Sequence, residues 1–146
     1  MELKFKIQKI KLLECHFKIN PEFDWANKPV NVSTSIGVQY AKKNKNVRVI
    51  LSVNSDDKNQ PFIFNTVLVG IFDFHEIPKP KELEKIANIN CAAILFPYVR
   101  EIVADLTRRA DLPPFHMDPV NFINFYEKLE QSRKESTKQT ITAEKK

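Results

Sequence analysis

The chain has 146 residues and a formal net charge of +5, and 42% of its residues are hydrophobic. This length suits one domain with its own core, and this hydrophobic content excludes an intrinsically disordered chain. The two cysteines, Cys15 and Cys91, lack metal-ligand spacing, so we expect two reduced, buried thiols.

Neither a secretory signal nor a membrane span is expected. Residues 1–10 alternate charged and apolar side chains and contain no apolar signal core. No apolar run in the chain reaches the length of a membrane-spanning helix. We therefore expect a cytoplasmic protein.

The front part of the chain is basic, with ten basic and four acidic side chains in residues 1–48. Such a charge attracts nucleic acids, membrane surfaces or acidic proteins. Lysines on a strand also discourage edge-to-edge pairing. No aromatic-rich nucleic-acid motif accompanies them, so a basic nucleic-acid-binding protein ranks last among the functions considered.

A long strand is predicted over residues 3–19. Its apolar phase changes between Ile7 and Ile10 and returns between Leu12 and Cys15, and a phase change within a strand requires a bulge or a bend. Residues 20–30 then form a loop bracketed by prolines. This loop carries Phe23 and Trp25, which are large side chains for a connection.

Three further strands are predicted over residues 30–40, 47–53 and 62–74, separated by polar turns. Short turns between successive strands favour an antiparallel meander. The last of these strands is apolar on both faces, whereas a sheet with one wet face alternates apolar and polar residues. Helices can cover one face, and a second subunit is the economical cover for the other. The expected oligomer-interface residues are Phe64, Thr66 and Leu68.

Helices are predicted in the last part of the chain. A first helix begins within residues 81–89, and an apolar stripe from Ile94 to Leu106 has helical spacing, with Pro97 near its start or at a kink. A proline-rich loop follows, after which Asp118 is the expected N-cap of the last helix and Pro119 its first residue. The prediction is an α+β fold with a four-stranded antiparallel sheet, a long crossover loop after its first strand, and two C-terminal helices on one face. We expect one domain over 1–130 and a disordered polar tail over 131–146.

No catalytic, cofactor or metal site is predicted. The three histidines lie far apart, and none is paired with Cys, Asp or Glu at ligand spacing. With only two glycines, the chain has no glycine-rich loop for a phosphate. No nucleophile is accompanied by a base.

Two motifs at a fixed separation carry a family resemblance. They read I-L-F-P-Y-V-R-E at 94–101 and P-V-N-F at 119–122, and weaker likeness extends the match over about residues 5–129. In this respect the chain resembles the SecB export chaperones. The resemblance implies an ATP-independent holdase for unfolded precursor polypeptides and a homotetramer built as a dimer of dimers. It also implies a client groove between the crossover loop and the last helix. The groove residues expected on this basis are Phe23, Trp25, Phe115, Phe122, Phe125 and Tyr126.

The resemblance also identifies a possible docking face for the translocase motor SecA, which export members contact through acidic groups. The aligned positions are Glu14, Lys18 and Asn65, of which only the first is acidic. This departure argues for a weakened SecA contact. The alternative is a SecB-like chaperone of a toxin–antitoxin system, which protects an antitoxin from aggregation.

Overall fold

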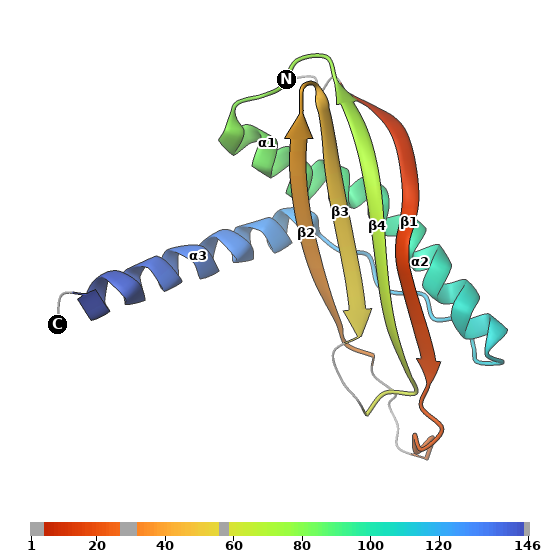
Figure 1. Ribbon diagram of the computed structural model, residues 1–146. Coiled ribbons are helices and arrows are strands. Elements are labelled where there is room, and N and C mark those ends of the chain that lie inside the picture. Colours follow the sequence, from red (N-terminus) through yellow and green to blue (C-terminus); the bar gives the residue numbers. More distant parts are fainter. Residues whose placement is uncertain (1–4, 27–31, 56–58, 145–146) are drawn as a thin grey trace.

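Four antiparallel strands form one open sheet in the computed structural model, which describes residues 5–26, 32–55 and 59–144 (Figure 1). The strands are β1 (Phe5–Ile19), β2 (Thr34–Lys43), β3 (Asn46–Ser55) and β4 (Phe62–Phe74), in the spatial order β1-β4-β3-β2. Strands β2 to β4 form the predicted meander, and β1 joins β4 through the crossover. The predicted α+β fold is confirmed.

Strand β1 contains two bulges, which confirm the predicted change of phase. Its pairing with β4 shifts between Ile7 and Lys9 and again between Leu12 and Glu14. Each shift adds one residue to β1, so the alternation of faces restarts after it. As a result, Ile7, Ile10 and Leu12 all lie on the same face of the sheet, although their spacing in the sequence is uneven.

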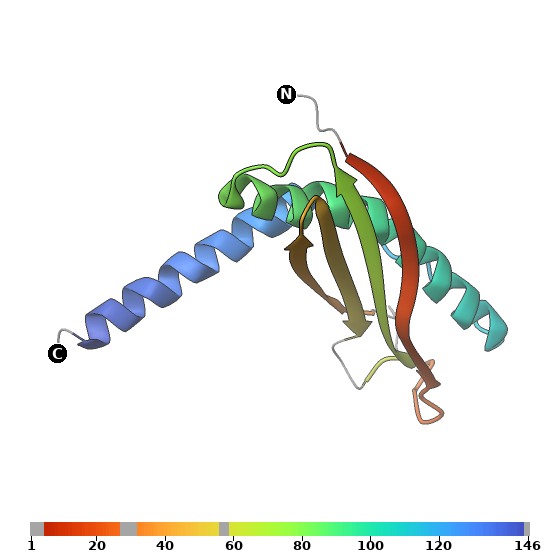
Figure 2. The ribbon, with the colours of Figure 1, turned by 45° about the horizontal axis from the view of Figure 1, so that its top comes forward.

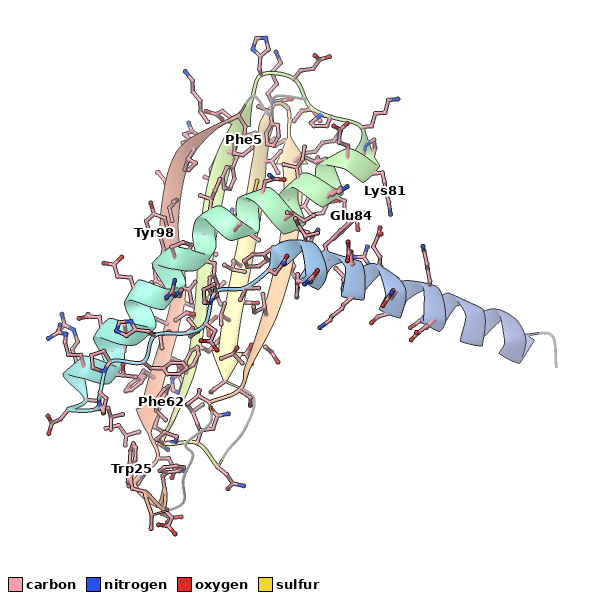
Figure 3. All side chains as sticks on the ribbon, turned by 180° about the vertical axis from the view of Figure 1, so that it is seen from behind. Phe5, Trp25, Phe62, Lys81, Glu84 and Tyr98 are labelled. Carbon is pink, nitrogen blue, oxygen red and sulfur yellow. The ribbon has the colours of Figure 1, made fainter. Side chains whose placement is uncertain are left out.

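A continuous helical rod crosses one face of the sheet (Figure 3). It consists of α1 (Pro80–Ile86), the π-helical turn η1 (Ala87–Cys91) and α2 (Ala92–Arg109). The sequence predicts two separate helices here, and in the structure they are joined through η1. Pro97 lies inside α2 with its ring exposed. The carbonyl that it leaves without a partner belongs to the exposed Ala93, where water can replace the missing N–H.

The core lies between this rod and the covered face of the sheet, here called the helix face. Phe64, Thr66 and Leu68 belong to it and are only 1%, 0% and 2% exposed. Within one chain the rod covers them, so they offer little surface to a second chain, and their assignment to an oligomer interface stays a prediction. Alternation in β4 defines two apolar faces, and α2 covers the one that holds these three residues.

Gly70 allows α2 to approach the sheet closely. A Cβ atom built there would lie 2.9 Å from a methyl carbon of Leu95 and 2.7 Å from the ring of Phe72. We expect Gly70→Ala to lower the free energy of unfolding by about 1–3 kcal/mol, since overpacking forces neighbours out of place. Urea denaturation measures this loss. Gly37→Ala is the control, because its Cβ would meet only the Ser52 hydroxyl, which can rotate away. Equal losses in both variants would contradict the explanation.

The last helix, α3 (Phe122–Glu144), starts later and ends later than the sequence predicts. Its cap is Asn121, whose Oδ1 accepts hydrogen bonds from the N–H groups of Ile123 and Asn124 at 3.1 and 3.2 Å. Asp118 and Pro119 precede it in an irregular segment. The helix continues through residues 131–144, where we expected a disordered tail. No glycine or proline follows Pro119 to end it, and extending an anchored helix is easier than nucleating one.

Only the start of α3 packs on the domain, where Phe122 and Tyr126 are each 4% exposed. Beyond this base the helix projects away from the sheet as an arm (Figures 1 and 2). Side chains 131–136 are exposed to solvent. The expectation of two helices packed on the sheet therefore holds for the α1–α2 rod along its length and for α3 at its base.

The rod Pro80–Arg109 is, among the described residues, the one helix with the length and composition to cross a membrane, which the sequence reading did not anticipate. Half of its most apolar window is buried within the domain. Its buried residues pack on the sheet, and core helices of this kind meet the same criteria.

Candidate functional site

Aromatic side chains gather at the end of the sheet where β1 stops and β4 begins. Phe17 stacks on Phe62 with ring centroids 5.7 Å apart, and Phe115 meets Phe62 edge-on at 5.6 Å. The N–H of Phe115 donates to the Thr107 hydroxyl at 2.9 Å, and that buried hydroxyl donates to the Val103 carbonyl. The predicted Phe115 is thus fixed between α2 and the sheet, partly exposed.

The crossover loop extends this aromatic group beyond the sheet. Trp25 is 49% exposed and meets Phe23 edge-on, with ring centroids 4.9 Å apart. The loop is anchored at its start, because Asn20 donates from its side chain to the Gln60 carbonyl at 3.0 Å. Figure 3 shows Trp25 at the end of the molecule, below Phe62. The remainder of the predicted crossover, residues 27–30, lies outside the described residues.

A second aromatic group surrounds the base of α3. Phe122 meets Phe96 at 5.8 Å and Phe125 at 5.9 Å, both edge-on. Phe122 and Tyr126 are buried, whereas Phe125 keeps part of its surface. Of the six predicted groove residues, four therefore keep exposed surface, namely Phe23, Trp25, Phe115 and Phe125, and Phe122 and Tyr126 do not.

A cavity of about 370 Å³ lies between the two aromatic groups. Phe115 from one group and Phe96 from the other both line it, and the chain from His116 to Val120 closes one side. The sequence reading missed Phe96. The sequence carries a signal for it, because a large aromatic side chain outside the apolar stripe from Ile94 to Leu106 needs a second surface to pack against.

Charged contacts tether α3 to α1. Lys81 Nζ lies 2.6 Å from Glu130 Oε1, and Arg133 forms an ion pair with Glu84. Figure 3 shows Lys81 and Glu84 at the end of the rod beside α3. The hydrogen bond from Lys81, with a second from the Tyr126 hydroxyl, holds the pKa of the Glu130 carboxyl below its usual value. The direction of the arm thus depends on charge as well as on the packing of its base.

We expect acid to loosen this tether. Because the pKa of Glu130 is lower in the folded state, its stabilising contribution is present above the unfolded pKa of about 4.3 and is lost as pH falls through the folded value. Amide exchange in residues 123–136, corrected for intrinsic pH dependence, should accelerate relative to α2 between neutral pH and about pH 3. Glu130→Gln should remove most of this difference. Equal protection at both pH values would contradict the tether.

The uncovered face of the sheet, here called the open face, carries the three predicted docking positions. Glu14 and Lys18 lie on β1, and Asn65 on β4 is the cross-strand partner of His16, which lies between them. The Asn65 amide donates to the Glu14 carboxylate at 3.3 Å. The three positions therefore lie close together on this face, and their single carboxylate already accepts a hydrogen bond from a neighbour.

Strand β1 is an edge strand with an apolar surface. Leu12 is 47% exposed, Leu13 41%, and Tyr98 on the adjoining α2 46%. A cavity of about 560 Å³ between β1 and α2 is lined by Leu12 and Tyr98 among others. An edge of this length with exposed apolar side chains is a template for pairing with another strand.

The expectation of two buried thiols is correct for Cys91 and wrong for Cys15. Cys15 on β1 is exposed, whereas Cys91 is buried, and burial raises the pKa of its thiol to about 12. A thiol with so high a pKa is a poor nucleophile. Within the part of the chain that the structure describes, no three His, Cys, Asp or Glu side chains form a group that could hold a metal ion.

Comparisons with known proteins agree on one family. The model of the family described as preprotein translocase subunit SecB matches residues 4–133. The protein-export protein SecB of Paracoccus denitrificans is 39% identical over 77 residues, which cover 53% of this chain and 43% of that protein. The SecB of Bartonella bacilliformis is 34% identical, with coverage of 58% and 54%. The chain thus matches about half the length of these export proteins.

Two other similar proteins match most of their length. An uncharacterized protein of Methanocaldococcus jannaschii is 29% identical over 144 residues, which cover 96% of this chain and 92% of that protein. Among solved structures, a SecB-like chaperone of Mycobacterium tuberculosis, in complex with a peptide from an antitoxin, superposes with a TM-score of 0.70 at 21% identity. The superposition covers 80% of this chain and 91% of that one. At this identity the likeness concerns the fold.

Proposed function

Because the chain belongs to the SecB family, we propose that it is a cytoplasmic, ATP-independent holdase chaperone that binds non-native polypeptides in the service of protein export. The observation that supports this most directly is the cavity between two aromatic groups, with the half-exposed Trp25 at one end of the surface. Its volume of about 370 Å³ falls within the range of ligand pockets, about 300–1,000 Å³.

Binding on this surface would rest on apolar area. Ring surface is exposed to an extended apolar chain at Phe23, Trp25 and Phe115. Burying this surface contributes about 25 cal/mol per Å² to the free energy of binding, less the cost of ordering the client. Such contacts read no particular sequence. By binding only the unfolded client, the protein would draw it away from folding and aggregation through mass action. This mechanism uses no nucleotide.

Assembly is proposed to occur through the β1 edge. Leu12, Leu13 and Tyr98 are exposed there, so pairing of β1 with its copy would bury apolar surface and satisfy the unpaired backbone groups of the edge. The lysines of β1 that oppose such pairing lie on the open face, whereas Leu12 lies on the helix face. The β1 edge is proposed as the interface in place of Phe64, Thr66 and Leu68, which the sequence suggested. The proposed homotetramer is a dimer of such dimers, and a mass of one 17.0 kDa chain at micromolar concentration would contradict it.

The test of the holdase proposal is suppression of aggregation. A chemically denatured client is diluted into buffer without ATP, and light scattering is followed with and without the protein. We expect scattering to fall at a stoichiometric ratio of protein to client. An inert protein of the same mass controls for crowding. Unchanged scattering at this ratio would refute the proposal.

A second candidate function is supported by the docking positions. Lys18 and Asn65 supply no negative charge, and the Glu14 carboxylate already accepts a hydrogen bond from Asn65. These positions favour a chaperone that serves an antitoxin and lacks a strong SecA contact. Each exposed charge pair contributes about 0.2–1 kcal/mol, so losing two weakens docking roughly tenfold. Tight, salt-sensitive binding to the C-terminal tail of SecA would restore the export role, and its absence with a retained holdase activity would favour the antitoxin role.

A further inference from the structure

The two bulges in β1 sort its lysines onto the open face. In a regular strand, Lys6 and Lys9 would point to opposite faces because their separation is odd. The extra residue Gln8 brings them to the same face, where Lys9 pairs with Ile71 of β4 and Lys11 with Val69. The uneven spacing of lysines in the sequence therefore becomes a regular row in the structure.

Basic residues of β2 and β3 complete a patch on this face. Arg48 is the other cross-strand partner of Ile71, so Lys9 and Arg48 flank that side chain with backbones roughly 10 Å apart. Figure 1 looks onto this face, which the helices leave uncovered. The basic patch consists of Lys6, Lys9, Lys11, Lys43 and Arg48, all exposed.

The patch has little internal neutralisation. Asp73, the partner of Lys6, is the one acidic residue of these cross-strand rows. Among the described residues, the ion pairs involve none of the five basic side chains. Such a concentration of one sign raises the local potential and attracts an oppositely charged partner. Pairing of β1 with another strand would leave this face uncovered, because strand addition extends a sheet in its own plane.

The centre of the patch is apolar, which distinguishes between acidic partners. Ile71, Val69 and Ile50 form adjoining cross-strand neighbours between the basic side chains. A phosphate backbone would make no use of them. All Phe and Tyr residues of the four strands lie on the helix face, and His16 of the open face lies outside the basic patch, so the patch has no stacking platform for bases. This apolar centre also offers little surface for insertion into a membrane, because Val69 is 2% exposed and Ile50 and Ile71 are only partly exposed.

We propose that the open face binds an acidic polypeptide segment whose carboxylates flank apolar residues. Its carboxylates would meet Lys9, Lys11 and Arg48, with the guanidinium able to bind one of them in bidentate fashion. Its apolar side chains would cover Ile71. This surface lies on the opposite side of the sheet from the α1–α2 rod, so it would be occupied independently of the client.

The test measures the affinity of a fluorescein-labelled peptide of alternating Glu and Leu residues by anisotropy. We expect binding that weakens as salt rises between about 50 and 200 mM. The triple variant Lys9→Glu, Lys11→Glu, Arg48→Glu should bind roughly tenfold or more weakly. The milder triple variant to Gln should lie between the two. Far-UV circular dichroism checks the fold, and suppression of client aggregation should be unchanged.

A matched control carries the same charge change elsewhere. The variant Lys42→Glu, Lys79→Glu, Lys128→Glu also lowers the formal net charge from +5 to −1, because each substitution changes it by two. It should bind the peptide about as well as the unchanged protein. Equal loss in both variants would show non-specific charge attraction and overturn the proposal. Tighter binding of poly(U) RNA or of phosphatidylserine vesicles than of the peptide, lost in the patch variant, would also overturn it. So would the absence of measurable peptide binding.

Discussion

Replacing Leu68 by arginine is expected to unfold the protein. Leu68 is 2% exposed on the helix face, between Leu12 of β1 and Leu51 of β3. A guanidinium in this position would be a buried charge without a partner, and its cost of several kcal/mol is comparable to the whole stability of a domain, about 5–15 kcal/mol. Thermal denaturation followed by circular dichroism, together with soluble yield, measures the effect.

Leu12→Arg is the matched control, because Leu12 is the direct cross-strand partner of Leu68 but is 47% exposed. Here the charge can reach water, so we expect the melting temperature to change little. The mass of the assembly should fall, because the proposed β1 interface would then carry a charge. A folded Leu68→Arg variant that only dissociates would instead support the interface at Phe64, Thr66 and Leu68 that the sequence suggested.

Removing the Trp25 side chain is expected to weaken client binding while leaving the fold intact. Trp25 is 49% exposed, and its ring contact in the described structure is with Phe23. If a client covers about 100 Å² of the indole, the contact contributes about 2.5 kcal/mol. Ordering costs of about 1 kcal/mol leave a net of about 1.5 kcal/mol, which corresponds to roughly a tenfold change in affinity. Titration of a labelled unfolded polypeptide against Trp25→Ala measures this loss. Addition of client should also shift the indole fluorescence of the unchanged protein.

Tyr40→Ala supplies the comparison. Tyr40 is also an exposed aromatic, at 37%, but it lies on β2 and is not one of the predicted groove residues. It should bind client normally. Phe122→Ala should behave differently again, because this side chain is buried and its loss costs about 3–5 kcal/mol of stability. An emission spectrum that stays constant at saturating client, with a destabilised Trp25→Ala variant, would mean that the indole only supports the loop.

Much of the fold could be predicted because short-range patterns carry it. Strand β4 was predicted with its observed bounds, since a mostly apolar run extends from Phe62 to Phe74 and a polar turn precedes it. The bulges of β1 were likewise visible in the phase change between Ile7 and Ile10. The start of α3 was not, because Asp118 with Pro119 and Asn121 are both plausible start signals, and the path of the preceding chain selects between them.

For the candidate site, the sequence could name loop and helix aromatics but not their exposure. Spacing cannot say that Phe122 is buried and Trp25 is half exposed. That difference depends on which side chains the rod and β1 cover. Phe96 likewise could not be predicted from spacing, because it lines the cavity only through packing between segments far apart in the chain.

By itself, the sequence determined the strands, the bulges, the helical stripe and the family, because each depends on the order of neighbouring side chains. Only the tertiary structure decided which face of β4 is core. A strand with two apolar faces is symmetric in its pattern, and the docking of α2 against Gly70 breaks that symmetry. Because α2 covers this face, Leu68 is buried while Leu12 stays exposed at the edge of the sheet. The lysines of β1 lie together on the opposite, open face.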